Sequence, residues 1–174
     1  MSYPWRPVAV LASLVVGVSA LLTACAAGSD PSRPESAAQP APPAPPAACV
    51  LDTAALAATT GLTWTPDETT ATDARCVYDP DGDPTGIDFV AVDIAPSRGA
   101  DTELDTLAGL CEDGSRAPVA ADGSGFVCRF QGGSVFAALV RGGQVVTVAA
   151  SAVPPGTTAA RLVVAFTQQL SATP

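Results

Sequence analysis

The sequence from Cys49 to the C-terminus predicts an α+β domain, in which about three helices pack on an antiparallel sheet in two layers. Three apolar segments at 126–130, 135–140 and 145–152 follow one another through short glycine-containing connections, a pattern typical of a three-stranded meander. Three further segments combine helix-capping residues with apolar positions at helical spacing. Each such helix has an apolar stripe, and packing on the sheet buries it.

The first expected helix spans 53–60. Asp52 or Thr53 can cap its first turn, and Gly61 can end it in the left-handed conformation that glycine adopts without strain. We expect Leu56 and the alanines of this helix to face inward.

Strands are expected after this helix, beginning at Trp64. Segments 75–78 and 87–94 are predicted to form two strands, joined by a turn at 79–84 that is rich in Asp, Pro and Gly. Because 87–94 is apolar at most positions, we expect both of its faces to be covered, at the centre of the sheet.

A second helix is expected to begin at Asp101 or Thr102, either of which can cap it. Glu103 and Asp105 would then lie in its first turn, where carboxylates interact favourably with the helix dipole. The polar segment 112–125 is expected to be a loop.

The C-terminal part is punctuated by glycine and proline. Glycine pairs at 132–133 and 142–143 supply the positive φ angles that tight turns require. Residues 154–156, Pro-Pro-Gly, end the sheet, and the last helix starts at Thr157 or Thr158. Its apolar stripe consists of Leu162, Val163, Phe166 and Leu170.

Four cysteines in the domain, Cys49, Cys76, Cys111 and Cys128, predict two disulfides, because their number is even and the chain is expected to be exported. Of the three possible pairings we favour Cys49–Cys76 with Cys111–Cys128, since each bond would fasten the end of a helix, or the segment that enters it, to a neighbouring strand. The alternative is a redox-active or metal-binding set of thiols, which lacks the close C-x-x-C spacing of such sites.

Asp79, Asp81 and Asp83 alternate as the first ligands of an EF-hand calcium loop do. The match then fails, because Pro84 stands where the loop needs a turning glycine and Val90 where it needs a bidentate glutamate. We interpret the segment as a turn and expect no metal site.

The composition excludes several classes of function. The chain contains no Lys, His or Asn, which excludes His-based nucleophilic sites, Schiff-base lysines and imidazole metal sites. A formal net charge of −9 disfavours nucleic acid as a partner. Carboxylates remain as candidate acid/base groups, in the pairs Asp88 with Asp93 and Glu112 with Asp113. Ser124 is not a candidate nucleophile, because the chain offers no base to activate it. We assign no catalytic residue and no cofactor.

Residues 1–24 are expected to be a lipoprotein signal peptide. The uncharged run 8–22 leads directly into a lipobox made of Leu22, Thr23, Ala24 and Cys25. Cleavage before Cys25 would leave a cysteine whose acyl chains anchor the protein on the extracytoplasmic face of the cell membrane. The alternatives are an ordinary signal peptide and an uncleaved anchor, although the run is shorter than the roughly 20 residues of a spanning helix.

Residues 25–48 are expected to form the lipidated cysteine and a linker, and residues 49–174 the folded domain. Seven prolines lie in this Pro/Ala-rich linker, a composition that favours an extended spacer over a packed core. Such a spacer would hold the domain away from the membrane.

The pattern resembles actinobacterial secreted lipoproteins, of mycobacterial and streptomycete type, that carry a cysteine-bounded domain of unknown function. The resemblance rests on the lipobox, the Pro/Ala spacer, Cys49 before a short helix that ends in glycine, and Cys76 before the aromatic strand residue Tyr78. The resemblance implies a two-layer α+β fold and surface anchoring, and it implies no particular activity.

We expect a monomeric, non-enzymatic binding or interaction module of the cell envelope, with a protein, lipid or other small-molecule partner. The alternatives are an accessory or sensor subunit of an envelope complex and, less favoured, an envelope enzyme that uses carboxylates. A groove between sheet and helices would favour the first function, and two facing acids in a cleft would favour the enzyme.

Overall fold

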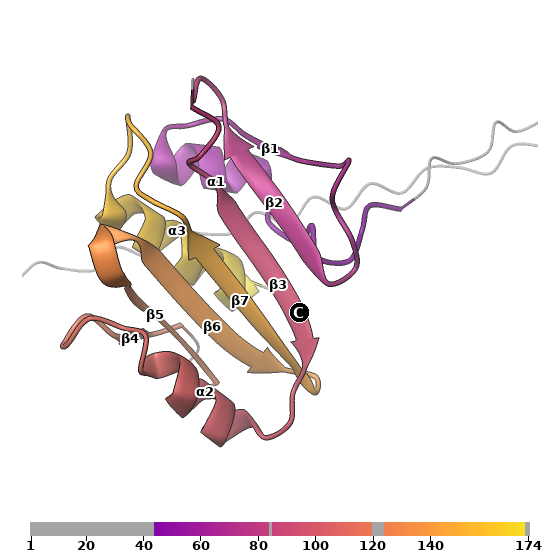
Figure 1. Ribbon diagram of the computed structural model, residues 1–174, viewed down its shortest axis with the longest axis vertical. Coiled ribbons are helices and arrows are strands. Elements are labelled where there is room, and N and C mark those ends of the chain that lie inside the picture. Colours follow the sequence, from indigo (N-terminus) through magenta and orange to yellow (C-terminus); the bar gives the residue numbers. More distant parts are fainter. Residues whose placement is uncertain (1–43, 84, 120–123, 173–174) are drawn as a thin grey trace, which may run out of the picture. The chain divides into compact units, whose positions relative to one another are not determined.

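Seven strands form one antiparallel sheet in the order β1-β2-β3-β7-β6-β5-β4 (Figure 1). The strands are β1 (Trp64–Pro66), β2 (Arg75–Pro80), β3 (Val90–Pro96), β4 (Ala117–Pro118), β5 (Gly125–Arg129), β6 (Val135–Arg141) and β7 (Gln144–Ala150). The helices are α1 (Thr53–Thr60), α2 (Ala100–Ala108) and α3 (Ala159–Ala172), with a 3-10 turn, η1 (Gln131–Gly133), between β5 and β6. The predicted α+β class and C-terminal meander are confirmed.

The structure, a computed structural model, describes residues 44–83, 85–119 and 124–172. The elements named above belong to one compact unit, Pro42–Pro174. The expected signal peptide, the lipobox at 22–25 and most of the Pro/Ala linker lie outside the described residues. Within the part that the structure describes, no helix combines the length and the apolar character needed to cross a bilayer.

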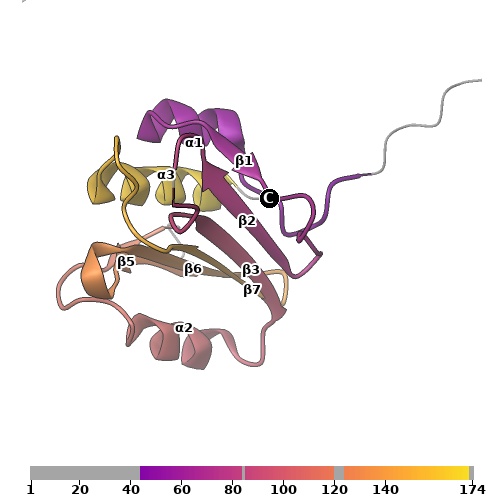
Figure 2. The ribbon, with the colours of Figure 1, turned by 45° about the horizontal axis from the view of Figure 1, so that its top comes forward.

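Helices α1 and α3 cover one face of the sheet, and α2 lies on the other face (Figure 2). The main core lies under α1 and α3, and a smaller apolar cluster lies under α2. In β5 and β6 neighbouring residues such as Phe136 and Ala137 belong to different clusters, because successive side chains of a strand point to opposite faces. Helix α2 therefore adds a partial third layer to the two expected from the sequence.

Strand β3 lies inside the sheet, between β2 and β7, as the apolar segment 87–94 predicts, although the strand begins only at Val90 and runs on to Pro96. It pairs with β7 along its whole length, from Val90 opposite Ala150 to Pro96 opposite Gln144. This pairing joins the N-terminal half of the domain to the C-terminal meander.

Helix α1 has the predicted bounds and caps. The Asp52 carboxylate accepts hydrogen bonds of 2.9 and 3.1 Å from two N–H groups of the first turn, and Gly61 ends the helix with a φ of 80°. The expectation that the alanines face inward is wrong, because they are exposed or half-buried and only Leu56 and Thr60 are buried. Two turns of helix present a single i, i+4 pair to the core.

Buried hydroxyl groups fix segment 51–64 on the sheet. The Thr60 hydroxyl donates to the Leu56 carbonyl (2.8 Å) and accepts from the Trp64 indole N–H (2.9 Å). The Tyr78 hydroxyl accepts from the Leu51 N–H (3.0 Å), and burial raises the pKa of Tyr78. Each buried polar group left without a partner would cost about 1–3 kcal/mol, so these bonds specify how α1 sits against β1 and β2.

Two disulfides join Cys49 to Cys76 and Cys111 to Cys128, which is the pairing favoured from the sequence. The first bond ties the segment before α1 to β2, and the second ties the segment after α2 to β5. The sequence separations are 27 and 17 residues. In the chain-entropy model, loops of this size correspond to about 3–4 kcal/mol of stabilisation per bond.

Strand β4 is the element that the sequence does not indicate, since 112–125 is expected to be a loop. Ala117 and Pro118 pair with β5 and form one edge of the sheet. Two residues are too few for a periodic pattern. Proline is thus present on both edge strands, at Pro66 in β1 and at Pro118 in β4.

The two disulfides predict the outcome of thiol alkylation. The chain carrying Cys25→Ser is expected to take up no alkyl group when it is unfolded without reductant, and four after reduction, because all four cysteines of the domain are bonded. Intact-mass spectrometry measures both values. Alkylation without reductant would contradict the pairing.

The packing of α3 predicts a large loss of stability for Phe166→Ala. Phe166 is fully buried, so its truncation is expected to lower the free energy of unfolding by about 3–5 kcal/mol through the cavity left behind. Val164→Ala, on the same helix at a side chain that is 47% exposed, is the control and should stay within about 0.5 kcal/mol. Urea denaturation measures both, and equal losses would contradict this packing.

Candidate functional site

Helix α2 lies against the sheet without a single buried residue. Its half-buried side chains Leu104, Leu107 and Ala108 rest on a cluster that includes Phe126 and Phe136. These three positions form one narrow stripe along the helix, because residues three and four apart lie on the same face. Hollows therefore remain along both flanks of α2.

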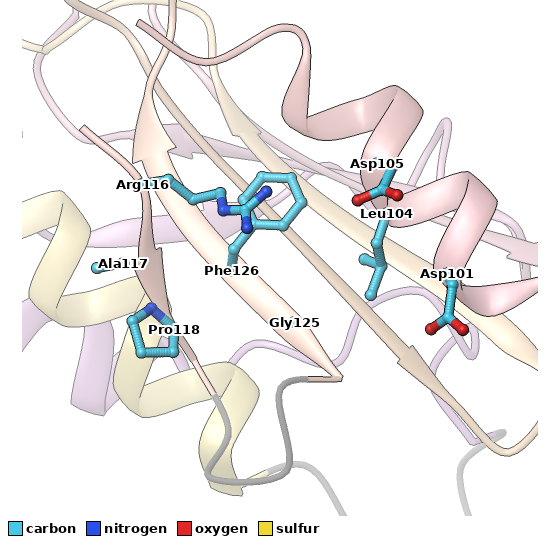
Figure 3. A pocket seen from close by; sticks show the side chains of 8 residues that line it. All are labelled: Asp101, Leu104, Asp105, Arg116, Ala117, Pro118, Gly125 and Phe126. Atoms are coloured by element: carbon cyan, nitrogen blue, oxygen red, sulfur yellow. The ribbon is translucent and has the colours of Figure 1, made fainter. Parts of the chain in front are cut away.

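The hollow between α2 and strands β4 and β5, here named the α2–β5 pocket, is the candidate functional site (Figure 3). Its volume of about 530 Å³ lies within the range of about 300–1,000 Å³ that is usual for small-molecule sites. The lining residues are Asp101, Leu104, Asp105, Arg116, Ala117, Pro118, Gly125 and Phe126. Figure 3 shows the two carboxylates on α2 and the guanidinium on the opposite wall.

The start of α2 leaves Asp101 available to this pocket. The expectation that Asp101 or Thr102 caps the helix is wrong, because the helix begins at Ala100 and its N-cap residue is Gly99, which has no side chain to cap it. Glu103 takes the capping role instead, accepting from the Arg98 N–H (2.8 Å) and the Ser97 hydroxyl (2.8 Å). These bonds lower the pKa of Glu103, with the Arg98 N–H as the largest cause.

Arg116 is held against the pocket wall by an aromatic ring. Its guanidinium carbon lies 5.7 Å from the centroid of the Phe126 ring, a cation–π distance. Phe126 is itself fixed by Phe136, whose ring centroid lies 6.1 Å away at a tilt of 52°. Within the described residues, Arg116 forms no ion pair or hydrogen bond. Its N–H donors are therefore free for a ligand.

Gly125, on the pocket wall, allows β5 to approach β6 closely. A Cβ atom at this position would lie 2.7 Å from the Ala138 carbonyl oxygen and would clash with the neighbouring strand. The sequence places Gly125 at the end of a polar loop, whereas the structure places it at the start of β5. The backbone carbonyl of Ser124 accepts from the Val140 N–H (2.8 Å), so pairing with β6 begins before the strand itself.

The other flank of α2 carries a second hollow of about 560 Å³, here named the α2–β7 groove. Most of its exposed lining is apolar, and the residues are Ala95, Pro96, Arg98, Thr102, Glu103, Thr106, Leu107, Val145 and Thr147. Its carboxylate, Glu103, is already held by the Arg98 backbone N–H and the Ser97 hydroxyl. In the α2–β5 pocket, by contrast, the carboxylates of Asp101 and Asp105 have no such bond within the described residues, and we therefore take this pocket as the candidate site.

The turn after β2 uses Asp83 to hold its own backbone. The Asp83 carboxylate accepts from the Thr85 hydroxyl (2.6 Å), the Thr85 N–H (2.8 Å) and the Asp88 N–H (3.1 Å). These bonds, the hydroxyl first, lower the pKa of Asp83 to about 2. Among the described residues, no group of three or more His, Cys, Asp or Glu side chains is arranged to hold a metal ion.

The carboxylate pairs considered from the sequence lie away from the α2–β5 pocket. Asp93 forms an ion pair with Arg75 at 2.7 Å, across the pairing of β2 and β3. Glu112 forms another with Arg129 at 3.4 Å, beside the Cys111–Cys128 disulfide. Asp88, whose backbone N–H is bound by Asp83, and Asp113 do not line it either. None of these four carboxylates therefore lines the α2–β5 pocket.

The sequence gives the pocket residues other roles. Asp101 is expected as a possible helix cap, Asp105 in the first turn of that helix, and Arg116 in a polar loop. One feature of the sequence could have indicated the position of Arg116, because the favoured Cys111–Cys128 bond requires the chain between these cysteines to fold back on itself. That return brings Arg116 over Phe126.

No family model, curated protein or solved structure matches this chain. The geometry of the α2–β5 pocket and the motifs of the sequence therefore carry the functional argument.

The hydrogen bonds of Asp83 predict a pH-dependent stability. They favour the ionised carboxylate in the folded state, so their contribution is complete above about pH 4 and is lost as the pH falls towards 2. Asp83→Asn should lower the melting temperature at pH 7, and its difference from the natural chain should shrink over that acidic interval. Thermal unfolding followed by circular dichroism measures the difference.

Thr85→Val is the second variant, because it removes the hydroxyl donor and keeps the backbone N–H. It should retain part of the pH dependence. Parallel pH profiles for the natural chain and Asp83→Asn would contradict the role of Asp83.

Proposed function

We propose that this protein is a lipoprotein of the cell envelope, anchored at Cys25, whose domain binds a ligand without catalysing a reaction. The α2–β5 pocket carries the binding part of this proposal, because it presents free charges of both signs above an apolar floor. Sites that bind small ligands combine such a floor with a few polar groups that fix orientation.

The cysteines support an extracytoplasmic location. Four of the five cysteines in the chain form disulfides, and such bonds persist in oxidising compartments. The fifth, Cys25, stands in the motif Leu22-Thr23-Ala24-Cys25 after an uncharged run, as a lipidated cysteine does. The resemblance to actinobacterial lipoproteins, itself part of this proposal, agrees with this arrangement.

A non-catalytic role is preferred because of where the pocket carboxylates lie. Asp101 and Asp105 both belong to α2, one turn apart on the same wall (Figure 3). A general acid and a general base need to flank the bond that they cleave. Two carboxylates on one wall instead offer a single acidic surface that suits a cationic group.

Metabolic labelling tests the anchoring part of the proposal. Cells expressing the natural chain and fed an alkynyl fatty acid are expected to yield a labelled protein, because acylation of Cys25 needs the intact motif. Cys25→Ala should remove the label. Cys49→Ala is the control, since it changes a cysteine of the domain and leaves the motif intact. Equal labelling of the natural chain and Cys25→Ala would overturn the proposal.

A further inference from the structure

The α2–β5 pocket keeps opposite charges apart instead of joining them. Asp101 and Asp105 stand on α2, and Arg116 stands across the pocket on the segment that leads into β4 (Figure 3). No ion pair or hydrogen bond of any of these three side chains is present within the residues that the structure describes. The hollow that they line has a volume of about 530 Å³, which is enough to admit a small ligand.

The position of Arg116 favours a carboxylate. A guanidinium stacked on an aromatic ring keeps the N–H donors at its edge free, and these donors match the two oxygens of a carboxylate. The Phe126 ring also reduces the conformational freedom that Arg116 would lose on binding. The anionic end of a ligand would therefore lie at this wall.

The wall formed by α2 favours a primary ammonium group. Asp101 and Asp105 are four residues apart, so their side chains lie about 5–6 Å from one another at the Cβ atoms. An ammonium group has three N–H donors, and two carboxylates at this spacing can together accept hydrogen bonds from them. The cationic end of a ligand would therefore lie between these two residues.

The floor of the pocket and the charge of the chain restrict the ligand further. Leu104, Ala117, Pro118 and Phe126 add apolar atoms to the pocket lining, which suits a spacer of small apolar side chains. The net charge of −9 repels a ligand that is anionic overall. A purely cationic ligand would leave Arg116 without a partner.

We propose that the α2–β5 pocket binds a short zwitterionic peptide, whose free carboxylate lies at Arg116 and whose free amino group lies at Asp101 and Asp105. This inference rests on the proposed binding function and names the chemistry of its ligand.

The experiment is an NMR titration of the full chain carrying Cys25→Ser, with unmodified di-, tri- and tetra-alanine as probes. Extended peptides of these lengths span about 7–14 Å, so the series finds the length that reaches both walls. The best-fitting peptide is then compared with its N-acetylated form and its C-terminal amide. We expect amide resonances in α2 and β5 to shift, and either modification to weaken binding about ten-fold, because each removes one charge-assisted contact.

Variants assign each end of the peptide to its wall. Arg116→Ala should weaken binding of the free peptide about ten-fold and should make the free peptide and its amide bind equally. The double variant Asp101→Asn, Asp105→Asn should likewise abolish the difference between the free and the N-acetylated peptide. Arg141→Ala and Asp113→Asn, which remove charges outside the pocket, are the controls and should bind as the unsubstituted chain does. The positions of resonances from α3 verify that each variant is folded.

Three outcomes would overturn the proposal. They are equal binding of free and modified peptides, shifts confined to residues outside α2 and β5, and no shift at about 10 mM peptide, where even a weak ligand binds. The fatty-acid labelling of Cys25 is read separately. A labelled protein without peptide binding would leave the anchoring intact and remove this ligand, whereas peptide binding without labelling would do the reverse.

Discussion

The pairing of β3 with β7 is the constraint on which the rest of the domain depends. It pairs residues that are 48 to 60 positions apart in the sequence, and it places the β1–β3 half beside the β5–β7 meander in one sheet. Because β3 lies inside the sheet, its Val90 and Val92 are fully buried beneath the α1 and α3 side. The chain leaves β3 on the opposite side, through α2, and returns by β4 and β5. The pocket exists because this excursion lays one short helix over a face that it only partly covers.

Local chemistry in the sequence predicts most of this fold. Asp52 and Gly61 set the bounds of α1, because a cap and a left-handed glycine act on neighbouring backbone groups. The meander follows from alternating apolar segments and the positive φ angles of Gly142 and Gly143, which no other residue adopts as readily. What escapes prediction depends on distant contacts. Strand β4 has two residues and exists only because β5 accepts it.

The candidate site is harder to predict for the same reason. Several acidic residues can cap the start of α2, and the sequence cannot rank them because the outcome depends on how the chain leaves β3. Glu103 reaches back to Ser97 and Arg98, and Asp101 is thereby left for the pocket. Arg116 gains its position through the return of the chain towards Phe126, which a linear pattern does not encode. The disulfide between Cys111 and Cys128 holds that return in place.

The two outer strands have a consequence for a protein confined to a surface. If the copies are tethered to a membrane, they are concentrated in two dimensions. Exposed edge strands of neighbouring copies then tend to pair with one another and to form aggregates. Pro66 and Pro118 each remove an N–H donor from one margin, and β4 offers only two residues for any foreign strand to join. Both edges of the seven-stranded sheet are thus poor partners for a further strand, which would keep crowded copies separate on the membrane.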